Sequence, residues 1–321
     1  MLQSAEFLAF RQLSAALGSD PLRVQGPGGN TSIKKDGAMW IKASGTELAD
    51  AATHDIFVGV DLKAARAEAY GDGDGSCKDT VLDPTLGLRP SIETTFHAAI
   101  EWPVIAHTHS IATLTHAISP EGRALARQKL AGLPAIFVPY AKPGLPLTRE
   151  ILARATAETQ IVVLENHGLI CGAASVTETE GLIEEVEHRL AMPDQRRQTA
   201  APETAAPTGY SWAAESWIAQ SKRAADLALG GSYYPDHVVF LGPALPDSTV
   251  DASRPAALIR DQGIAIRDGA TASQKAMLRC LSDLLARLPS DWQIEAIGAD
   301  AEAALLDWDA EKYRQALAAR R

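Results

Sequence analysis

The chain has 321 residues, 46% hydrophobic and 22% charged, so it can bury the core of one large domain or two smaller ones. Its net charge is −10 and no basic stretch compensates for it, which excludes a general nucleic-acid-binding protein. No run approaches the roughly 18 apolar residues of a membrane span, and the N-terminus lacks the pattern of a secretory signal. The three cysteines lie far apart, which is typical of a reducing compartment. We therefore expect a soluble cytoplasmic protein without nucleic-acid or membrane partners.

Residues 1–192 alternate between helical and extended patterns, which indicates an α/β domain. Apolar spacing and helix-start residues predict helices over 6–17, 91–101 and 175–190, with two more that begin at 110 and 148. Apolar runs of strand length predict strands over 31–34, 39–42, 56–60, 102–107, 135–138, 161–164 and 168–172. Asp36-Gly37 predicts a hairpin between the first two strands.

The composition changes after residue 192. Residues 199–209 contain two prolines and no apolar periodicity, which is typical of a linker. We predict a catalytic domain over 1–192, a linker over 193–209 and a smaller C-terminal α/β extension over 210–321. In the extension, the pattern predicts helices over 211–229, 271–288 and 301–319, and strands over 238–241 and 264–266.

His107 and His109 stand at the end of an apolar run that predicts a strand. Residues i and i+2 of a strand point to the same face, so both imidazoles can bind one ion. His167 follows the predicted strand 161–164, and Glu93 can supply a carboxylate. Three protein ligands with an open position are typical of a catalytic zinc site. A pair of structural histidines on a strand is the alternative that spacing alone leaves open.

Residues 26–32 form a glycine-rich turn that leads into a predicted strand. Glycines let backbone N–H groups approach an anion closely, and Asn, Ser and Thr add side-chain donors. The turn matches neither the Walker A nor the dinucleotide pattern, so on its own a plain turn is the simpler interpretation. A second small-residue turn lies at 43–46, and Lys42 and Arg89 place cations near these segments.

Five motifs, in this order, resemble the class II aldolase/adducin family, which includes zinc-dependent fuculose-phosphate and rhamnulose-phosphate aldolases. They are Gly-Gly-Asn-Thr-Ser at 28–32, Ala-Ser-Gly-Thr at 43–46, Arg-Pro-Ser-Ile-Glu-Thr-Thr-Phe-His at 89–97, His-Thr-His at 107–109 and Glu-Asn-His-Gly-Leu at 165–169. The resemblance covers about residues 5–190 and implies a three-layer α/β/α fold with a central mixed sheet. The C-terminal part, including 234–241, is similar to the aldolase half of larger proteins that fuse this module to a dehydrogenase.

The resemblance also implies roles for single residues. The metal ligands of the family match His107, His109 and His167, and its catalytic acid/base matches Glu93. Its substrate- and phosphate-binding positions match Gly29, Asn30, Ser44, Gly45 and Ser91. Zinc is the expected ion, and the ligand types also suit manganese, iron or cobalt. Ile92 stands where these aldolases often have a serine, so an unphosphorylated hydroxy-ketone or hydroxy-acid is a second candidate substrate.

The expected function is therefore that of a metal-dependent aldolase-type lyase that cleaves a ketose or ketose 1-phosphate through a metal-stabilised enediolate. The family also contains dehydratases, 4-epimerases and decarboxylases that use the same site, so its shared motifs leave these alternatives open. A non-catalytic adducin-like scaffold is a further alternative, although adducin-type modules lack the metal histidines. Relatives place the site at subunit interfaces, so we expect a homo-oligomer, either a tetramer or a dimer. The similarity to the fused enzymes suggests a separately encoded dehydrogenase as a partner.

His97 lies one helical turn after Glu93, and we expect it to pack behind the site rather than bind the ion. His237 is expected in a turn. Tyr140 follows the predicted strand 135–138 but does not match the position of the family's catalytic tyrosine, which therefore has no assigned counterpart.

Overall fold

The computed structural model describes residues 4–196, 200–248 and 253–318. Residues 197–199 of the predicted linker and residue 319 of the last predicted helix lie outside the described residues. Within the described ranges, no helix combines the length and the apolar character needed to cross a membrane.

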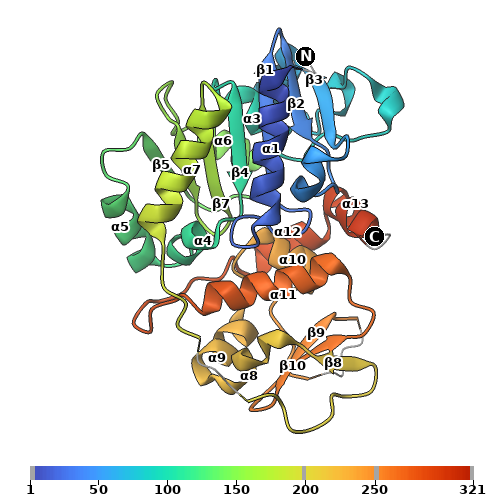
Figure 1. Cartoon of the computed structure of the whole chain (residues 1–321), viewed down its shortest axis with the longest axis vertical. Coiled ribbons are helices and arrows are strands. Elements are labelled where there is room, and N and C mark those ends of the chain that lie inside the picture. The colour runs from blue at the N-terminus through green and yellow to red at the C-terminus, as the bar shows by residue number, and fades with distance from the viewer. Residues whose placement is uncertain (1–3, 197–199, 249–252, 319–321) are drawn as a thin grey trace.

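A mixed sheet forms the centre of the first part of the chain, as predicted (Figure 1). Its strands are β1 (Asn30–Lys35), β2 (Ala38–Lys42), β3 (Phe57–Asp61), β4 (Val104–Thr108), β5 (Ala135–Val138), β6 (Ile161–Leu164) and β7 (Gly168–Ala173). The strand order is β3-β2-β1-β4-β7-β6-β5. Only β5 and β6 pair in parallel among these described strands, and the other neighbours are antiparallel.

Helices cover both faces of this sheet, which confirms the predicted three-layer fold. One face carries α1 (Ala5–Ser19), α4 (Ile111–Ala117), α5 (Pro120–Lys129) and α7 (Val176–Leu190). The other face carries α2 (Leu62–Tyr70), α3 (Thr94–Ala99) and α6 (Leu145–Leu152). In β6, Ile161 and Val163 enter the first core while Val162 and Leu164 enter the second. A strand buried on both faces needs this continuous apolar run, which is why β6 shows no polar alternation.

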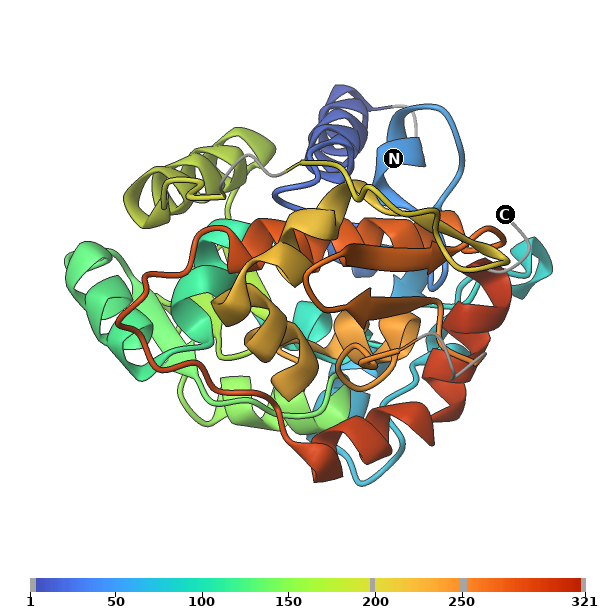
Figure 2. The ribbon, with the colours of Figure 1, turned by 90° about the horizontal axis from the view of Figure 1, so that it is seen from below.

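The C-terminal part combines helices with a small antiparallel sheet of order β8-β10-β9 (Figures 1 and 2). Its strands are β8 (Tyr210–Trp212), β9 (Ala256–Ile259) and β10 (Gly263–Arg267). Its helices are α8 (Trp217–Gln220), α9 (Lys222–Gly230), α10 (Pro235–Leu241), α11 (Ala272–Leu285), α12 (Ala299–Leu306) and α13 (Asp309–Ala318).

The two parts of the chain share buried surface. Ile111, Leu114 and Ile118, from α4 and its C-terminal end, belong to the same core as α9, α10 and α11. The helix α13 crosses back to the first part, where the Tyr313 ring lies 4.1 Å from the Arg89 guanidinium (Figure 1). The extension therefore packs on the sheet domain, while the domain boundaries at 192 and 210 stay a prediction.

Three predicted elements of the extension were wrong. Residues 238–241, predicted as a strand, belong to the helix α10, which begins at Pro235 and is buried throughout. A short run that is apolar on all sides suits a buried helix as well as a strand, so periodicity could not separate the two. The predicted helix 211–229 is divided into β8, α8 and α9, with Ser221 capping the N-terminus of α9. The predicted helix 301–319 is divided at Trp308, whose ring packs against the Lys142 ammonium.

Candidate metal centre and active site

The sheet brings together residues from three separate motifs. Strands β1 and β4 are antiparallel, and their register places Asn30 opposite His107. Side chains of such cross-strand neighbours lie on the same face of the sheet. On the other side of β4, the strands β7 and β6 form a hairpin whose turn carries His167. The ends of three neighbouring strands thus converge on one point.

Close backbone packing holds the turn with His167 against β4. Asn166 adopts a left-handed conformation with φ 53°, and Gly168 has φ 156°. A Cβ atom at Gly168 would lie only 2.2 Å from the Thr108 carbonyl oxygen. Any side chain there would push the turn away from β4, so glycine is needed for His167 to reach the other histidines.

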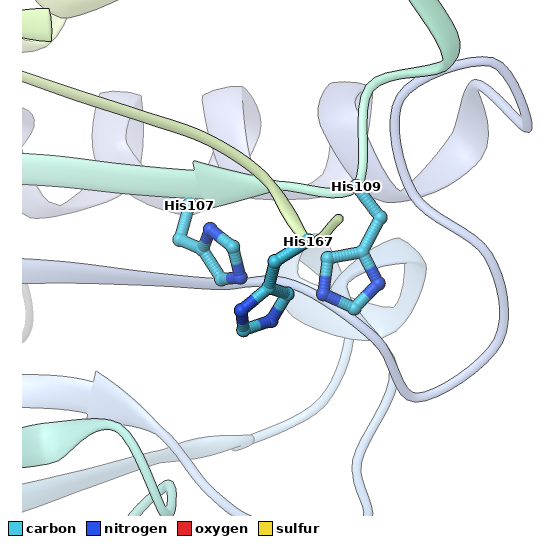
Figure 3. A group of neighbouring side chains, drawn as sticks. All are labelled: His107, His109 and His167. Carbon is cyan, nitrogen blue, oxygen red and sulfur yellow. The ribbon is translucent and has the colours of Figure 1, made fainter. Parts of the chain in front are cut away.

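The three predicted histidines face one another, as Figure 3 shows. Their ring centroids are 5.0 Å apart for His107 and His109, 4.9 Å for His107 and His167, and 5.3 Å for His109 and His167. One ring nitrogen of each can be chosen so that all three lie within 4.8 Å of one another. All three side chains are buried, at 0–4% exposure. This spacing suits a single ion that each imidazole binds through one nitrogen.

Glu93 lies against two of these rings. Its Oε2 is 3.5 Å from His107 Nε2, and its Oε1 is 3.5 Å from His167 Nε2. The His107 Nδ1 lies 3.0 Å from the Leu169 carbonyl oxygen, which can accept its proton and leave Nε2 free as an acceptor. Among the described residues, His107 Nε2 and Glu93 Oε1 are buried without a hydrogen-bond partner. Buried polar atoms without partners at the centre of a histidine cluster fit a divalent ion as the missing partner.

The ionisation states also suit metal binding. Burial lowers the pKa of His109 to about 3 and that of His167 to about 3, so both rings are neutral near pH 7. Burial alone would raise the pKa of Glu93, but His107, His167 and the Asn30 amide together lower it below its ordinary value. A neutral imidazole and an ionised carboxylate are the forms that ligate a metal.

A hydrogen-bonded chain behind Glu93 fixes its orientation. Asn30 Nδ2 donates to Glu93 Oε2 at 2.8 Å and also lies 3.2 Å from Ser91 Oγ. The Oδ1 atom of Asn30 is bonded to His97 Nε2, and Ser32 Oγ lies 2.8 Å from His97 Nδ1. Because Asn30 Oδ1 needs a donor, His97 carries its proton on Nε2 and the amide can only point its NH₂ at Glu93. His97 therefore packs behind the site, as predicted.

Most predicted site residues line one cavity. From the first part of the chain they are Gly29, Asn30, Ser44, Gly45, Ser91, Glu93, His109 and His167, and His107 lies behind Glu93. Lys42 also lines this cavity, and burial lowers the pKa of its ammonium to about 7. Arg89 does not line it, because its guanidinium lies over the Tyr313 ring. The turn at Gly45 is covered by α13, since a Cβ atom there would lie 2.3 Å from Leu317 Cδ1.

Three cavity residues come from the extension and were not predicted as site residues: Pro235, Asp236 and Arg314. Asp236 lies in the first turn of α10, and Arg314 lies in α13. Asp236 Oδ2 is 3.4 Å from His109 Nδ1, and both residues are buried. Residues 234–241 entered the prediction through their similarity to fused enzymes and through His237, but Asp236 was given no role, and no local pattern pointed to Arg314. Their role depends on a tertiary contact that spacing along the chain does not show.

Comparison with known proteins identifies the fold. The sequence model of the class II aldolase and adducin N-terminal domain matches residues 15–192, more than half of the chain. The chain belongs to this family. The class II aldolase domain thus contains Glu93 and the three histidines, and it ends before α10 and α13 begin.

Two relatives illustrate this match. The N-terminal class II aldolase domain of a conserved protein from Thermoplasma acidophilum has 25% sequence identity and a TM-score of 0.52. The alignment covers 59% of this chain and 93% of that one. A Bacillus subtilis (strain 168) protein named "Uncharacterized oxidoreductase YuxG" is 31% identical over 213 residues. That match covers 59% of this chain but only 30% of the relative.

His237 and Tyr140 are not among the residues that line the cavity. His237 was predicted in a turn, but it lies inside α10, where burial lowers its pKa to about 3. The prediction was wrong because its segment forms a helix rather than a turn and strand. Tyr140 is not one of the cavity-lining residues, and burial raises the pKa of its hydroxyl to about 12. No tyrosine of the described residues lines the cavity, so no counterpart of the family's catalytic tyrosine is assigned among them.

Proposed function

We propose that this class II aldolase-family chain is a metal-dependent aldolase-type lyase that cleaves a ketose or a ketose 1-phosphate. The buried group of His107, His109 and His167 beside Glu93 is the observation that carries the proposal. A catalytic metal site uses three converging imidazoles as ligands, whereas an adducin-like scaffold needs none. Zinc is the proposed ion, and manganese, iron or cobalt are alternatives of suitable ligand preference.

His107, His109 and His167 would hold the ion. A divalent ion at this point supplies Lewis-acid stabilisation for the negative charge that develops when the bond next to a carbonyl breaks. Burial keeps His109 and His167 neutral near pH 7, so both rings can donate a nitrogen lone pair to the ion. Burial of the ligands keeps bulk water from screening that charge.

Glu93 would move the proton at the carbon where the bond breaks. Its carboxylate lines the cavity next to His167, and Asn30 holds one of its oxygens at 2.8 Å. Oε1 makes no hydrogen bond within the described residues, so it would accept or deliver the proton once substrate takes its place beside the ion. An ionised carboxylate in a fixed position serves as general base in one direction and, once protonated, as general acid in the other.

Gly29, Asn30, Ser44, Gly45 and Ser91 would bind the far end of the substrate. They surround the same cavity, and Lys42 adds an ammonium group. The side chains of Asn30 and Ser91 are engaged with Glu93 and its backbone, so Ser44, backbone N–H groups and Lys42 would make the direct contacts. Leu317 lies over Gly45, so α13 limits the room for a phosphate group on that side of the turn.

An assay of aldehyde release from ketoses and ketose 1-phosphates tests the proposal. The protein is loaded with Zn²⁺, and a chelator-treated sample and the Glu93→Gln variant serve as controls. Cleavage that the chelator abolishes supports the aldolase. Absence of cleavage despite stoichiometric bound metal would contradict it and favour a dehydratase, 4-epimerase or decarboxylase at the same site.

The cellular setting belongs to the proposal as well. A homo-oligomer, tetramer or dimer, a cytoplasmic location and a separately encoded dehydrogenase partner stay predictions. Sedimentation of the purified chain, and co-purification with a dehydrogenase encoded nearby, would test the first and the last of these.

A further inference from the structure

A carboxylate from the extension contacts a histidine of the candidate metal centre. Asp236 lies outside residues 15–192, which match the family, yet its Oδ2 is 3.4 Å from His109 Nδ1. In Figure 3, one ring nitrogen of His109 points toward the other two rings and the second points away. Since Nδ1 lies beside Asp236, Nε2 is the nitrogen that remains for the ion.

The backbone makes room for this contact. A Cβ atom at Gly28 would lie 2.8 Å from Asp236 Oδ2 and 2.8 Å from His109 Nδ1. Any other residue at position 28 would therefore press against both partners. The glycine-rich turn thus has a use besides approaching an anion, because it admits a carboxylate from another part of the chain.

The carboxylate is held firmly on its other side. Arg314 Nη1 donates to Asp236 Oδ1 at 3.0 Å, and Nη2 donates to Oδ2 at 3.2 Å. Glu311 accepts two further bonds from Arg314 Nη1, at 2.9 and 2.8 Å. Arg314 thus contacts both oxygens of Asp236, which is the geometry of a bidentate arginine–carboxylate pair. A paired, fixed anion of this kind keeps its orientation toward His109.

We propose that Asp236, held by Arg314, is a positioning residue that completes the metal centre from the C-terminal extension. Asp236 accepts the Nδ1 proton of His109, which fixes the ring tautomer and directs Nε2 to the ion. The Leu169 carbonyl provides the same support for His107. A carboxylate in this position also makes the imidazole a stronger ligand. The inference rests on the proposed metal centre, and it assigns the extension a part in metal binding.

Asp236→Asn tests this role with Zn²⁺ as the probe. Asparagine has one acceptor oxygen, so it cannot serve both Arg314 and His109 as the two carboxylate oxygens do. Loss of such outer support weakens metal affinity roughly 10- to 100-fold. The dissociation constant of Zn²⁺ is measured by competition with a chromophoric chelator, and the visible spectrum of Co²⁺-loaded protein reports the ligand geometry.

Asp283→Asn is the matched control. Asp283 is also a buried carboxylate of the extension, and it also pairs with arginines, Arg196 and Arg287. It lies away from the histidines, in α11, so its Zn²⁺ affinity should stay within twofold of wild type. A loss of affinity in Asp236→Asn alone supports the inference, and equal affinities in both variants and wild type overturn it.

Two measurements separate this inference from the proposed function. Wild-type protein that binds no Zn²⁺ would overturn the metal centre itself and this inference with it. If Asp236→Asn fails to fold, nitrogen NMR of the histidine rings in Zn²⁺-loaded wild-type protein decides. A protonated Nδ1 on His109 that exchanges slowly with water supports the role of Asp236, and a metal-bound Nδ1 refutes it.

Discussion

Arg314 is expected to be the most sensitive residue of the extension, and Arg314→Met is the change that tests this. The guanidinium makes four hydrogen bonds to Asp236 and Glu311. Both carboxylates are only 2% exposed. Methionine keeps much of the apolar stem of arginine but removes the charge, so two carboxylates would be left close together without their cation.

The expected loss can be estimated from this geometry. Removing one partner of a buried ion pair costs about 3–5 kcal/mol of unfolding free energy. Burial raises the pKa of Glu311 to about 7, so this group can take up a proton in the variant, which favours the lower end of the range. With an unfolding entropy of about 2.1 cal/mol/K per residue, the midpoint of a 321-residue chain should fall by roughly 4–7 °C.

Calorimetry of metal-free protein measures this effect at pH 6 and pH 8. The loss of unfolding free energy in Arg314→Met, relative to wild type, should be larger at pH 8. At pH 6 a protonated Glu311 removes one of the two buried negative charges. Arg260→Met is the matched control, since Arg260 also faces two carboxylates, Asp226 and Asp247, but is 46% exposed. Exposed pairs contribute about 1 kcal/mol or less. A loss below about 1 kcal/mol in Arg314→Met, equal to the control, would refute the reasoning.

Three other variants test separate parts of the molecule. Glu93→Gln should retain bound metal and lower kcat about 10²- to 10⁴-fold, and full turnover in that variant would exclude Glu93 as acid/base. Gly45→Ala should lower the free energy of unfolding for two reasons, the φ of 77° at this position and the clash of the new Cβ atom with Leu317. Adding Leu317→Ala should remove the clash but not the backbone strain, so a double-mutant cycle should show partial recovery of the unfolding free energy. Burial lowers the pKa of His116 to about 4. Between about pH 6.5 and 4 only the unfolded state binds this proton, which lowers the free energy of unfolding by up to about 3 kcal/mol. His116→Gln should therefore lose less stability on acidification than wild type. Plots of unfolding free energy against pH that run parallel for the two proteins would contradict this.

The pairing of His107 and His109 could be predicted because its geometry is local to a single strand end. His107 and His109 are two residues apart at a strand end, which by itself places both rings on one side. The position of His167 beside them depends on strand order, which the residues alone did not specify. There the resemblance to class II aldolases supplied the missing information.

The extension was harder to predict because its buried segments lack a distinct period. Residues 238–241 are apolar on every side, and the contacts of α10 with the rest of the chain decide that they form a helix. Asp236 and Arg314 are separated by 78 residues, and their pairing appears only when α10 and α13 meet. Charge pairs of this kind are set by tertiary structure and leave no local pattern in the sequence.

The origin of the cavity residues indicates where substrate choice has to be decided. The three histidines and Glu93 lie within residues 15–192, which match the family as a whole, so in the proposed function these residues alone do not determine which substrate enters. Pro235, Asp236 and Arg314 reach the same cavity from the extension, and Leu317 covers the turn at Gly45. In the proposed function, a substrate that reaches the ion therefore has to fit between these family motifs and α13. Substitutions on the exposed side of α13 should leave both Zn²⁺ affinity and the KM values of different substrates unchanged. Substitutions on its cavity side should change KM by different factors for different substrates, which a purely structural helix would not do.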